Sequence, residues 1–378
     1  MLNNTLNILQ TKLFIVPTVS KFPTTRYQGN KLKYVDWIWN CIKDLEFHSV
    51  LDAFGGTSVV AYKMKKNNKS VTYNDILLFN HIIGKALIEN DSEKIDGEDL
   101  DFILTKQKNI DYPNFIATTF NDVYYTDEEN KWLDMVVTNI RLIPNEYKKA
   151  IAFFALFQSC IIKRPYNLFH RKNLYIRFQE VKRSFGNKVT WDTPFETHFK
   201  NFIQEANDAV FSNCQENISI NKDILSIKNN FDLVYIDSPY ISENGVGLDY
   251  LDFYHFLEGI MNYDDWAEMI DPKSKHKRLK LKKPKYTDAI PRLGIIKSSD
   301  LNNSEDGEHK LISVKKETPL NEVISLMLLH NFSQIPILSS RREVYGLISW
   351  KSIGKALSLG KKCTSVIDCY EQVEILNY

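Results

Sequence analysis

The sequence has few of the features that mark a metal site, a disulfide framework or a membrane segment. Its five cysteines include no Cys-x-x-Cys pair and its eight histidines are scattered, so we expect neither metal ligands nor disulfides. The longest apolar run, residues 150–157, is too short to cross a bilayer. The first residues lack the basic start and the small-residue cleavage site of a signal peptide. These absences favour a reduced, cytoplasmic protein that is not embedded in a membrane.

An excess of one charge is also missing from the chain as a whole. The formal net charge is +1 and 43% of the residues are hydrophobic, an ordinary profile for a soluble protein. With 378 residues there is room for two or three domains. Composition therefore does not identify a function, and the argument rests on motifs and their order.

The most informative motif is Asp237-Ser238-Pro239-Tyr240, which follows an apolar run at residues 233–236. Such a strand end suits a planar amine, because the Asp237 carboxylate and the carbonyl of residue 238 can each accept a hydrogen bond from an NH2 group. Proline restricts the turn through its fixed φ, and Tyr240 offers a ring on which a base can stack. A strand that ends in an acid and a proline turn is also common in α/β proteins, so an ordinary turn stays open.

A glycine turn lies far upstream, after a short strand predicted at residues 49–52. Gly55 and Gly56 allow a backbone to approach a nucleotide-like ligand closely, and the helix that follows offers free N–H groups. Dinucleotide-binding folds share this kind of turn. The next predicted strand ends in Asn74-Asp75, and an acid at this place suits hydrogen bonds to a ribose.

Two further segments add candidate residues. Residues 26–31 precede a helix whose apolar residues recur at helical spacing between positions 35 and 45, and a loop lysine before an ordinary helix is the alternative interpretation of this segment. Asp223 follows another short strand predicted at residues 218–220. For this residue an exposed acid in a turn is the alternative.

In this order, the segments resemble N6-adenine DNA methyltransferases of the Dam type over residues 20–285. The tetrad resembles their Asp-Pro-Pro-Tyr motif, with Ser238 in place of the first proline. Residues 49–60 resemble their Asp-x-Phe-x-Gly-x-Gly loop, in which the last glycine falls on Thr57 or Ser58. The N-terminal segment matches their aromatic-x-Gly-x-Lys element through Tyr27, Gly29 and Lys31.

The resemblance implies an α/β fold with a Rossmann-like core that binds S-adenosyl-L-methionine and requires no metal. It implies methylation of the N6 atom of an adenine flipped out of double-stranded DNA. The catalytic residues that it implies are Asp237, Ser238, Pro239 and Tyr240. The cofactor-binding residues that it implies are Tyr27, Lys31, Asp52, Phe54, Gly55, Asp75, Asp223 and Asp237.

Between about residues 80 and 215 the chain is longer than one helix and one strand require, and we interpret this stretch as a mainly helical recognition insertion. Residues 163–183 within it are rich in basic and aromatic side chains, which suit contacts with DNA. We expect DNA contacts from Lys163, Arg164, Arg171 and Lys172, with a solvated basic loop as the alternative. A second basic run, residues 273–285, has eight Lys or Arg and no acid. Such a run is usually solvated, but next to a DNA site it would also hold phosphates.

After residue 285 the resemblance to methyltransferases stops. From residue 311 we predict a strand, a helix, two strands and a helix, a βαββα order that resembles one CBS motif, and residues 363–375 resemble the opening of a second. We place the methyltransferase domain at 1–290, a linker at 291–310 and the CBS unit at 311–378. Because Ser352 stands where these motifs usually carry a ribose-binding acid, a packing or dimerisation role is favoured over an adenosyl nucleotide site.

A complete methyltransferase sheet would add about three strands after the tetrad. Their absence predicts that the strand at 233–236 is an exposed apolar edge, and hence a protein that is poorly stable and weakly active or inactive. Our interpretation is a site-specific DNA adenine methyltransferase in a restriction–modification or DNA-marking context. Two alternatives stay open: an inactive remnant that binds DNA or nucleotide, and a regulatory protein whose working part is the CBS unit.

Overall fold

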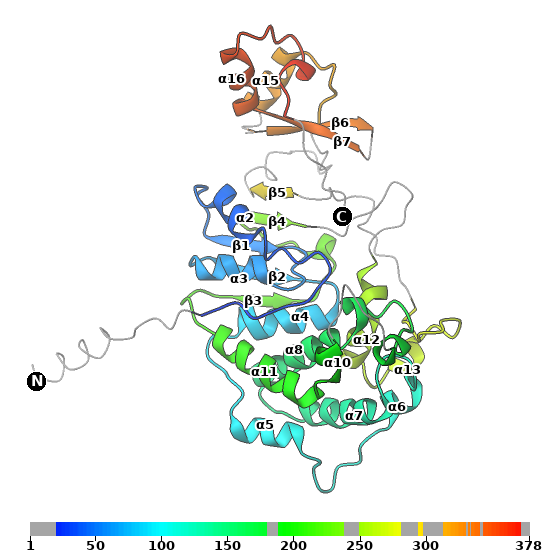
Figure 1. Ribbon diagram of the computed structural model, residues 1–378. Coiled ribbons are helices and arrows are strands. Elements are labelled where there is room, and N and C mark those ends of the chain that lie inside the picture. The colour runs from blue at the N-terminus through cyan, green and yellow to red at the C-terminus, as the bar shows by residue number, and fades with distance from the viewer. Residues whose placement is uncertain are drawn as a thin grey trace, which may run out of the picture. The chain divides into compact units, whose positions relative to one another are not determined.

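A five-stranded β-sheet organises the first of the two units into which the chain divides. The computed structural model describes residues 20–179, 188–237, 249–280, 294–297, 313–329, 332, 334–340 and 343–371. Unit 1 spans residues 1–295 and unit 2 spans residues 296–378. Figure 1 shows the elements of each unit, coloured in chain order from blue to red.

The sheet of unit 1 has the strand order β3-β2-β1-β4-β5. Strand β1 pairs in parallel with β2 and with β4, and β2 pairs in parallel with β3. The bounds are β1 Ser49–Asp52, β2 Ser70–Asn74, β3 Ile218–Ile220, β4 Leu233–Ile236 and β5 Gly294–Lys297. Parallel strands are buried on both faces and therefore have continuous apolar sequences, as the runs at β1 and β4 do. The expected α/β class with a parallel sheet is confirmed.

The expectation that β4 forms the edge of this sheet is wrong. Strand β5, Gly294–Lys297, lies next to β4, so β4 is an inner strand with β1 on its other side. The four-residue strand Gly-Ile-Ile-Lys lies within the segment predicted to be a linker. One short strand is enough to cover an edge, because edge protection requires only that the open N–H and C=O groups are paired.

Alternate residues of β1 and β4 face different cores. Val50 and Leu233 belong to the large core of unit 1. Their neighbours Leu51 and Val234 belong to a smaller cluster on the other face, together with the partly buried Phe54. The period-two alternation of side chains along a strand separates the two sets.

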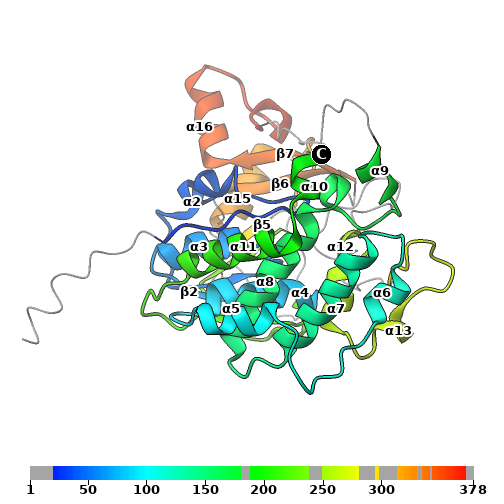
Figure 2. The same cartoon turned by 60° about the horizontal axis from the view of Figure 1, so that its bottom comes forward.

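The helices of unit 1 surround this sheet and fill the chain between β2 and β3. Their bounds are α2 Val35–Ile42, α3 Val59–Lys66, α4 Leu78–Gly84, the π-helix η1 Lys85–Glu89, α5 Gly97–Leu104, α6 Phe115–Thr119, α7 Asp127–Arg141, α8 Glu146–Ile162, the 3-10 helix η2 Pro165–Asn167, α9 Tyr175–Phe178, α10 Lys188–Asp192, α11 Phe195–Ala209, the 3-10 helix η3 Ile224–Ser226, α12 Tyr250–Met261 and α13 Trp266–Met269. Helix α3 packs on β1 and β2, and α8 packs against α4, α7 and α11 (Figure 2).

Helix α8 forms the centre of the helical region because its sequence is apolar on all sides. Every residue from Ala150 to Ile161 is buried, including the polar Gln158 and Ser159. Its N-terminus is capped by Asn145, whose side chain accepts hydrogen bonds from two backbone N–H groups of the first turn. A helix that is hydrophobic all round belongs in a protein core.

The described residues of unit 2 form two α-helices, a 3-10 helix and an antiparallel strand pair. The bounds are α15 Leu320–Leu329, β6 Gln334–Ser340, β7 Glu343–Ser349, α16 Trp350–Ser358 and the 3-10 helix η5 Val366–Asp368. In place of the first predicted strand, Val314 makes a single parallel bridge to Ile337. Residues after α16 return to the strand pair, where Glu371 bridges Leu347.

The described residues have neither a membrane-spanning helix nor a cluster of metal-binding side chains. None of their helices has both the length and the apolar composition needed to cross a membrane. None of their histidine, cysteine, aspartate and glutamate side chains gathers into a group of three that could hold a metal ion.

Candidate active site

Three acidic side chains lie where neighbouring strands of the sheet end. Asp52 ends β1, Asp75 follows β2, and Asp237 follows β4. The three strands are parallel and adjacent, so their carboxyl ends meet at one edge. The connection from β1 runs to β2, whereas β4 lies on the opposite side of β1. In open α/β sheets ligands bind at such a reversal of strand order, outside the carboxyl ends of the strands.

The glycine turn after β1 is pressed against β2. The Gly55 N–H donates to the Asn74 carbonyl at 2.8 Å, and the Tyr73 hydroxyl donates to the Gly56 carbonyl at 2.7 Å. A Cβ atom on Gly55 would come within 1.9 Å of the Tyr73 ring, and Gly56 has a φ of +49°. Only glycine suits both positions, which explains the paired glycines of the motif.

Asp75 holds this turn in place. Its Oδ2 accepts hydrogen bonds from the Gly56 N–H at 3.0 Å and from Asn80 Nδ2 at 3.1 Å. Its Oδ1 accepts from the Leu77 N–H at 2.9 Å. Burial raises the pKa of Asp75 to about 6, and the hydrogen bonds to its oxygens oppose that rise. Both oxygens of Asp75 therefore already serve the local structure.

Asp52 is less exposed than Asp75, and the backbone N–H groups nearest its oxygens do not form hydrogen bonds of normal geometry. Its relative exposure is 1%, and neither carboxylate oxygen has a hydrogen bond of normal geometry within the described part of the chain. Burial and the nearby charges of Asp237 and Asp75 raise its pKa to about 8, and the Ala61 and Phe54 N–H groups oppose that rise. An unpartnered buried carboxyl group is costly. The position of Asp52 fits a ligand that brings a positive charge or hydrogen-bond donors.

Asp237 forms an ion pair with the N-terminal segment. Lys31 Nζ lies 2.6 Å from Asp237 Oδ2, and it also donates to the Gly29 carbonyl at 3.0 Å. The structure thus brings together two residues that the sequence analysis assigned to one site from segments about 200 positions apart. Ser238, Pro239 and Tyr240 lie outside the described residues.

Tyr27 is the middle ring of a stack of three tyrosines. Its ring is parallel to Tyr254, with centroids 4.5 Å apart, and to Tyr250 at 5.5 Å. The Tyr254 hydroxyl accepts from the Gln28 N–H at 2.7 Å, and Asn80 Nδ2 donates to the Tyr27 hydroxyl at 3.1 Å. Helix α12 therefore anchors the N-terminal segment beside the site.

Sequence reasoning missed Tyr250, Tyr254 and Asn80 as parts of this arrangement. Tyr250 and Tyr254 are four residues apart on α12, a spacing that places two side chains on one face of a helix. That spacing was the available signal. Nothing local in the sequence indicated that this face contacts Tyr27.

Phe54 and Asp223 lie on the side of the site formed by the small core. Phe54 packs in the same cluster as Ile224, the residue after Asp223. The Asp223 side chain accepts from the Leu225 N–H at 3.0 Å. The preceding turn is tied to β2 because Asn221 Nδ2 donates to the Asp75 carbonyl at 2.7 Å. Asp223 is thus near the predicted cofactor residues, with one of its oxygens used in a local turn.

The four predicted DNA contacts divide into two pairs. Lys163 and Arg164 are each 1% exposed, so the prediction that they contact DNA is wrong. Arg171 and Lys172 are exposed, and Lys172 pairs with Asp122 at 2.8 Å. The second pair stays a prediction.

The two buried cations stabilise the fold from within. Lys163 Nζ donates to the Trp191 carbonyl at 2.7 Å and pairs with Glu129 at 2.9 Å. Arg164 donates to the carbonyls of Tyr124 and Arg171, each at 3.1 Å. A buried charge requires such partners, and the motif's basic composition did not reveal them.

Comparisons with known proteins identify the family of the chain. Residues 27–285 match the family model of the D12 class N6 adenine-specific DNA methyltransferases, and residues 308–359 match the CBS domain. The chain is 31% identical over 249 residues to the Type II methyltransferase M2.HphI of Haemophilus parahaemolyticus, an alignment that covers 64% of this chain and 72% of the relative.

Two further relatives are more distant. Identity with the Type II methyltransferase M.NlaIII of Neisseria lactamica is 24% over 278 residues, which cover 70% of this chain and 77% of the relative. Identity with the Type II methyltransferase M.FokI of Planomicrobium okeanokoites is 26% over 261 residues, 63% of this chain and 37% of the relative. No solved structure matches the chain.

Proposed function

The chain belongs to the D12 class N6 adenine-specific DNA methyltransferases and carries a CBS domain, and from this premise we propose that it transfers a methyl group from S-adenosyl-L-methionine to the N6 atom of an adenine flipped out of double-stranded DNA. One observation carries the proposal. At the carboxyl edge of a parallel sheet, the buried Asp52 carboxyl group, which has no hydrogen bond of normal geometry to the described residues, lies near Asp237, and Asp237 pairs with Lys31.

The cofactor would be held at the ends of β1 and β2. S-adenosyl-L-methionine supplies a methyl group activated by a positively charged sulfur. Asp52 is placed to neutralise a positive charge of the cofactor, and Phe54 and Gly55 would line its place beside the glycine turn. Asp75 holds the turn and Asp223 lies close by. The strand order supports a Rossmann-like frame for this site, because ligands bind at its reversal point.

The target amine would be held by Asp237 and the carbonyl of Ser238. Lys31 places a positive charge 2.6 Å from the Asp237 carboxylate, which favours the ionised form that accepts hydrogen bonds. A carboxylate directed at the NH2 group orients the nitrogen lone pair and stabilises the positive charge that develops on nitrogen during transfer. Tyr240 would stack on the flipped base, with Pro239 restricting the turn between them.

The partner and the biological setting are further parts of the proposal. Exposed Arg171 and Lys172 would contact phosphates of double-stranded DNA. Several relatives are named Type II methyltransferases, which supports a restriction–modification context.

In unit 2, Ser352 is 4% exposed and exchanges hydrogen bonds with Ser349 at the start of α16. This position therefore does not favour an adenosyl nucleotide, and we propose packing or dimerisation for unit 2.

The test is a methylation assay with purified protein, labelled S-adenosyl-L-methionine and genomic DNA, followed by mapping of methylated adenines. Asp237→Ala should lower methyl transfer by about 10²-fold or more, because it removes a contact made in the transition state. DNA binding should persist, because phosphate contacts supply most of the affinity. Asp111→Ala is the matched control, since Asp111 is an exposed acid of the same unit.

Both variants should keep the thermal melting temperature of the parent within a few degrees. A folded Asp237→Ala protein that methylates adenine at the parent rate would contradict the role of Asp237. A folded parent protein that binds DNA and leaves every adenine unmodified would contradict the proposed function.

A further inference from the structure

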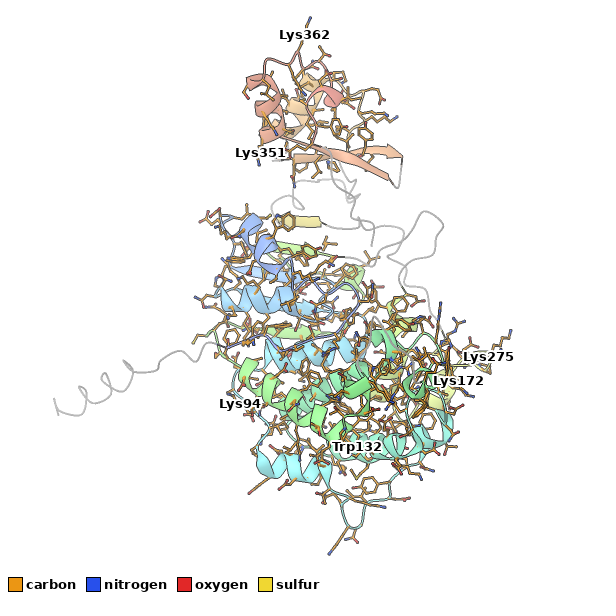
Figure 3. All side chains as sticks on the ribbon, in the orientation of Figure 1. Lys94, Trp132, Lys172, Lys275, Lys351 and Lys362 are labelled. Carbon is orange, nitrogen blue, oxygen red and sulfur yellow. The ribbon has the colours of Figure 1, made fainter. Side chains whose placement is uncertain are left out.

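Two basic segments that are distant in the sequence meet on one side of unit 1. The first lies between α8 and α9 and carries Arg171 and Lys172. The second follows α13 and carries Lys273, Lys275 and Lys277, all exposed. In Figure 3, Lys172 and Lys275 lie close together, whereas Lys94 lies on the opposite side of the unit. We call the side chains of Arg171, Lys172, Lys273, Lys275 and Lys277 the cationic surface.

The second segment is an ordered turn. Ile270 and Leu279 form an antiparallel bridge at its base, and Leu279 is 1% exposed. The Asp271 N–H donates to the Arg278 carbonyl at 2.8 Å, and the Asp271 side chain accepts from the Lys273 N–H at 3.0 Å. The buried base and the internal hydrogen bonds leave the three lysines at the exposed tip.

A buried tyrosine joins the first segment to the backbone of the second, between Lys275 and Lys277. The Tyr124 hydroxyl lies 2.6 Å from the carbonyl oxygen of Phe169 and 2.8 Å from that of His276. It also lies 2.7 Å from His255 Nε2. His276 is 152 residues from Tyr124 along the chain. Both segments contact this hydroxyl, whose single proton is donated to one carbonyl oxygen at a time, so the two basic segments are adjacent.

Helix α12 links the cationic surface to the candidate active site. Near its start, Tyr250 and Tyr254 stack on Tyr27. Between and after them, the Phe253 carbonyl accepts from the Phe169 N–H at 2.9 Å, and His255 contacts Tyr124. These residues span less than two helical turns, about 8 Å at most along the helix axis. One short stretch of α12 therefore contacts both the N-terminal segment beside the candidate site and the residues that join the two basic segments.

The charges of this surface are available for a polyanion. Within the described part of the chain, Arg171 and the three tip lysines make no ion pair, and only Lys172 is paired, with Asp122. This differs from Lys163 and Arg164, whose charges are satisfied inside the fold. Exposed Tyr166 and Tyr175 lie on the first segment, 54% and 60% exposed. Cations interleaved with aromatic rings are typical of nucleic-acid contacts.

We propose that the cationic surface, including the turn at residues 270–279, holds the phosphate backbone of double-stranded DNA beside the methyl-transfer site. Duplex DNA carries one charge per about 1.7 Å of its axis, a spacing that offers a phosphate to each of several neighbouring lysines. This inference rests on the proposed function. In addition to the recognition insertion, it assigns DNA contacts to a second element, which follows β4 in the sequence.

The test compares two triple variants of the full chain. K273Q/K275Q/K277Q removes the tip charges, and K94Q/K106Q/K108Q removes three exposed lysines elsewhere in unit 1. Both lower the net charge equally, so any difference reflects position. Binding to a labelled duplex is measured by fluorescence anisotropy over a range of salt concentrations. The slope of log affinity against log salt should fall by about 0.9 for each phosphate that a variant can no longer neutralise.

The tip variant should show a slope smaller by about 2 to 3 if two or three lysines contact phosphates, and the control should keep the parent slope. Melting of both proteins, with and without S-adenosyl-L-methionine, should match the parent. A tip variant with the parent slope and affinity would overturn the inference. The same decrease in both variants would also overturn it, because it would show a dependence on total charge alone.

The binding readout separates this inference from the proposed function. One outcome is a fall in the slope of log affinity against log salt in the tip variant while the parent protein methylates no adenine. This outcome would support DNA binding by the cationic surface and contradict the proposed enzymatic function. If the tip variant binds and methylates like the parent, while Asp237→Ala is inactive, the enzymatic proposal stands and the surface falls.

Discussion

Asp52 and Asp75 end neighbouring strands and are buried to a similar degree, but their surroundings differ. Asp75 accepts three hydrogen bonds and holds the glycine turn. Asp52 has none of normal geometry in the described structure, although it lies beside Asp237. The fold itself satisfies the Asp75 carboxylate, whereas we propose that a bound ligand supplies the charge or the donors that Asp52 lacks. Hydrogen-bond partners therefore distinguish a supporting acid from a ligand-binding acid better than burial does.

The same distinction separates the basic residues. Lys163 and Arg164 have internal partners, whereas Arg171 is exposed and without an ion pair among the residues that the structure describes. Only eight positions separate Arg164 from Lys172. The internal pair stabilises the segment that presents the external pair, so adjacent basic residues have different tasks.

The largest expected effect on stability comes from breaking the internal charge cluster. Glu129 pairs with Lys163 at 2.9 Å and with Arg177 at 2.7 Å, and both cations are buried. Glu129→Ala should lower the free energy of unfolding by about 3–5 kcal/mol, because it leaves two buried cations without their carboxylate. Denaturant unfolding measures this change. Lys172→Ala is the control and should change it by less than about 0.5 kcal/mol.

Equal decreases in these two variants would contradict the division between internal and external charges. The DNA-binding assay provides the complementary check. Lys172→Ala should reduce the salt slope of binding by up to about 0.9, a change that its small effect on unfolding cannot produce.

A smaller effect on stability should distinguish Asp75 from Asp52. At pH 8, Asp75→Asn should lower the free energy of unfolding by about 1–3 kcal/mol, because an amide cannot accept all three hydrogen bonds. Asp52→Asn should leave it unchanged or raise it, because the variant removes a buried carboxyl group that has no hydrogen bond of normal geometry among the described residues. Thermal and denaturant unfolding of both ligand-free variants check this order.

Added cofactor should stabilise the parent protein more than the Asp52→Asn variant. S-adenosyl-L-methionine should raise the melting temperature of the parent protein and have little effect on Asp52→Asn. A cofactor-induced rise in Asp52→Asn as large as in the parent would show that Asp52 does not carry the cofactor's charge.

The smallest expected effect is a pH dependence of cofactor affinity. The pKa of Asp52 is about 8 in the ligand-free protein, so below pH 8 a cationic ligand must displace a proton. Affinity for S-adenosyl-L-methionine should therefore rise between pH 6 and 8, by up to about tenfold per pH unit, and level off above 8. Calorimetry in buffers of different ionisation enthalpy should detect the proton release. In Asp52→Asn the dependence should disappear.

The ligand-free protein should show the opposite pH dependence in its free energy of unfolding. Because the folded pKa of Asp52 is raised above its ordinary value of 3.8, its folded carboxyl group retains a proton that the unfolded chain has released between about pH 4 and 8. The ligand-free protein should lose stability over this range. Asp75 and Glu258 contribute in the same direction, with pKa values of about 6 and 7. The test therefore compares the free energies of unfolding of the parent and of Asp52→Asn. The difference between these two free energies should grow as the pH rises.

Much of the candidate site was predictable because its parts are local. An apolar run that ends in Asp52 and a pair of glycines specifies a strand and a tight turn within eight residues. Lys31 and Asp237 were assigned to one site by resemblance, and their 2.6 Å contact agrees with that assignment. The edge position of β4 was predicted wrongly, because the pairing with β5 depends on a strand about 60 residues away. The burial of Arg164 was missed for the same reason, since its carbonyl acceptor on Tyr124 is 40 residues away.

The sequence by itself determined the apolar strands, the glycine turn, the family of the chain and the acids at the strand ends, because each of these follows from residues that are close neighbours. The tertiary structure decided which acid has partners, which cations face inward, and that two basic segments meet through Tyr124. These outcomes depend on contacts between segments as far as 152 residues apart. The free energy of a buried polar or charged group is set by the partners that the fold brings to it, and a residue's type and its sequence neighbours do not specify those partners.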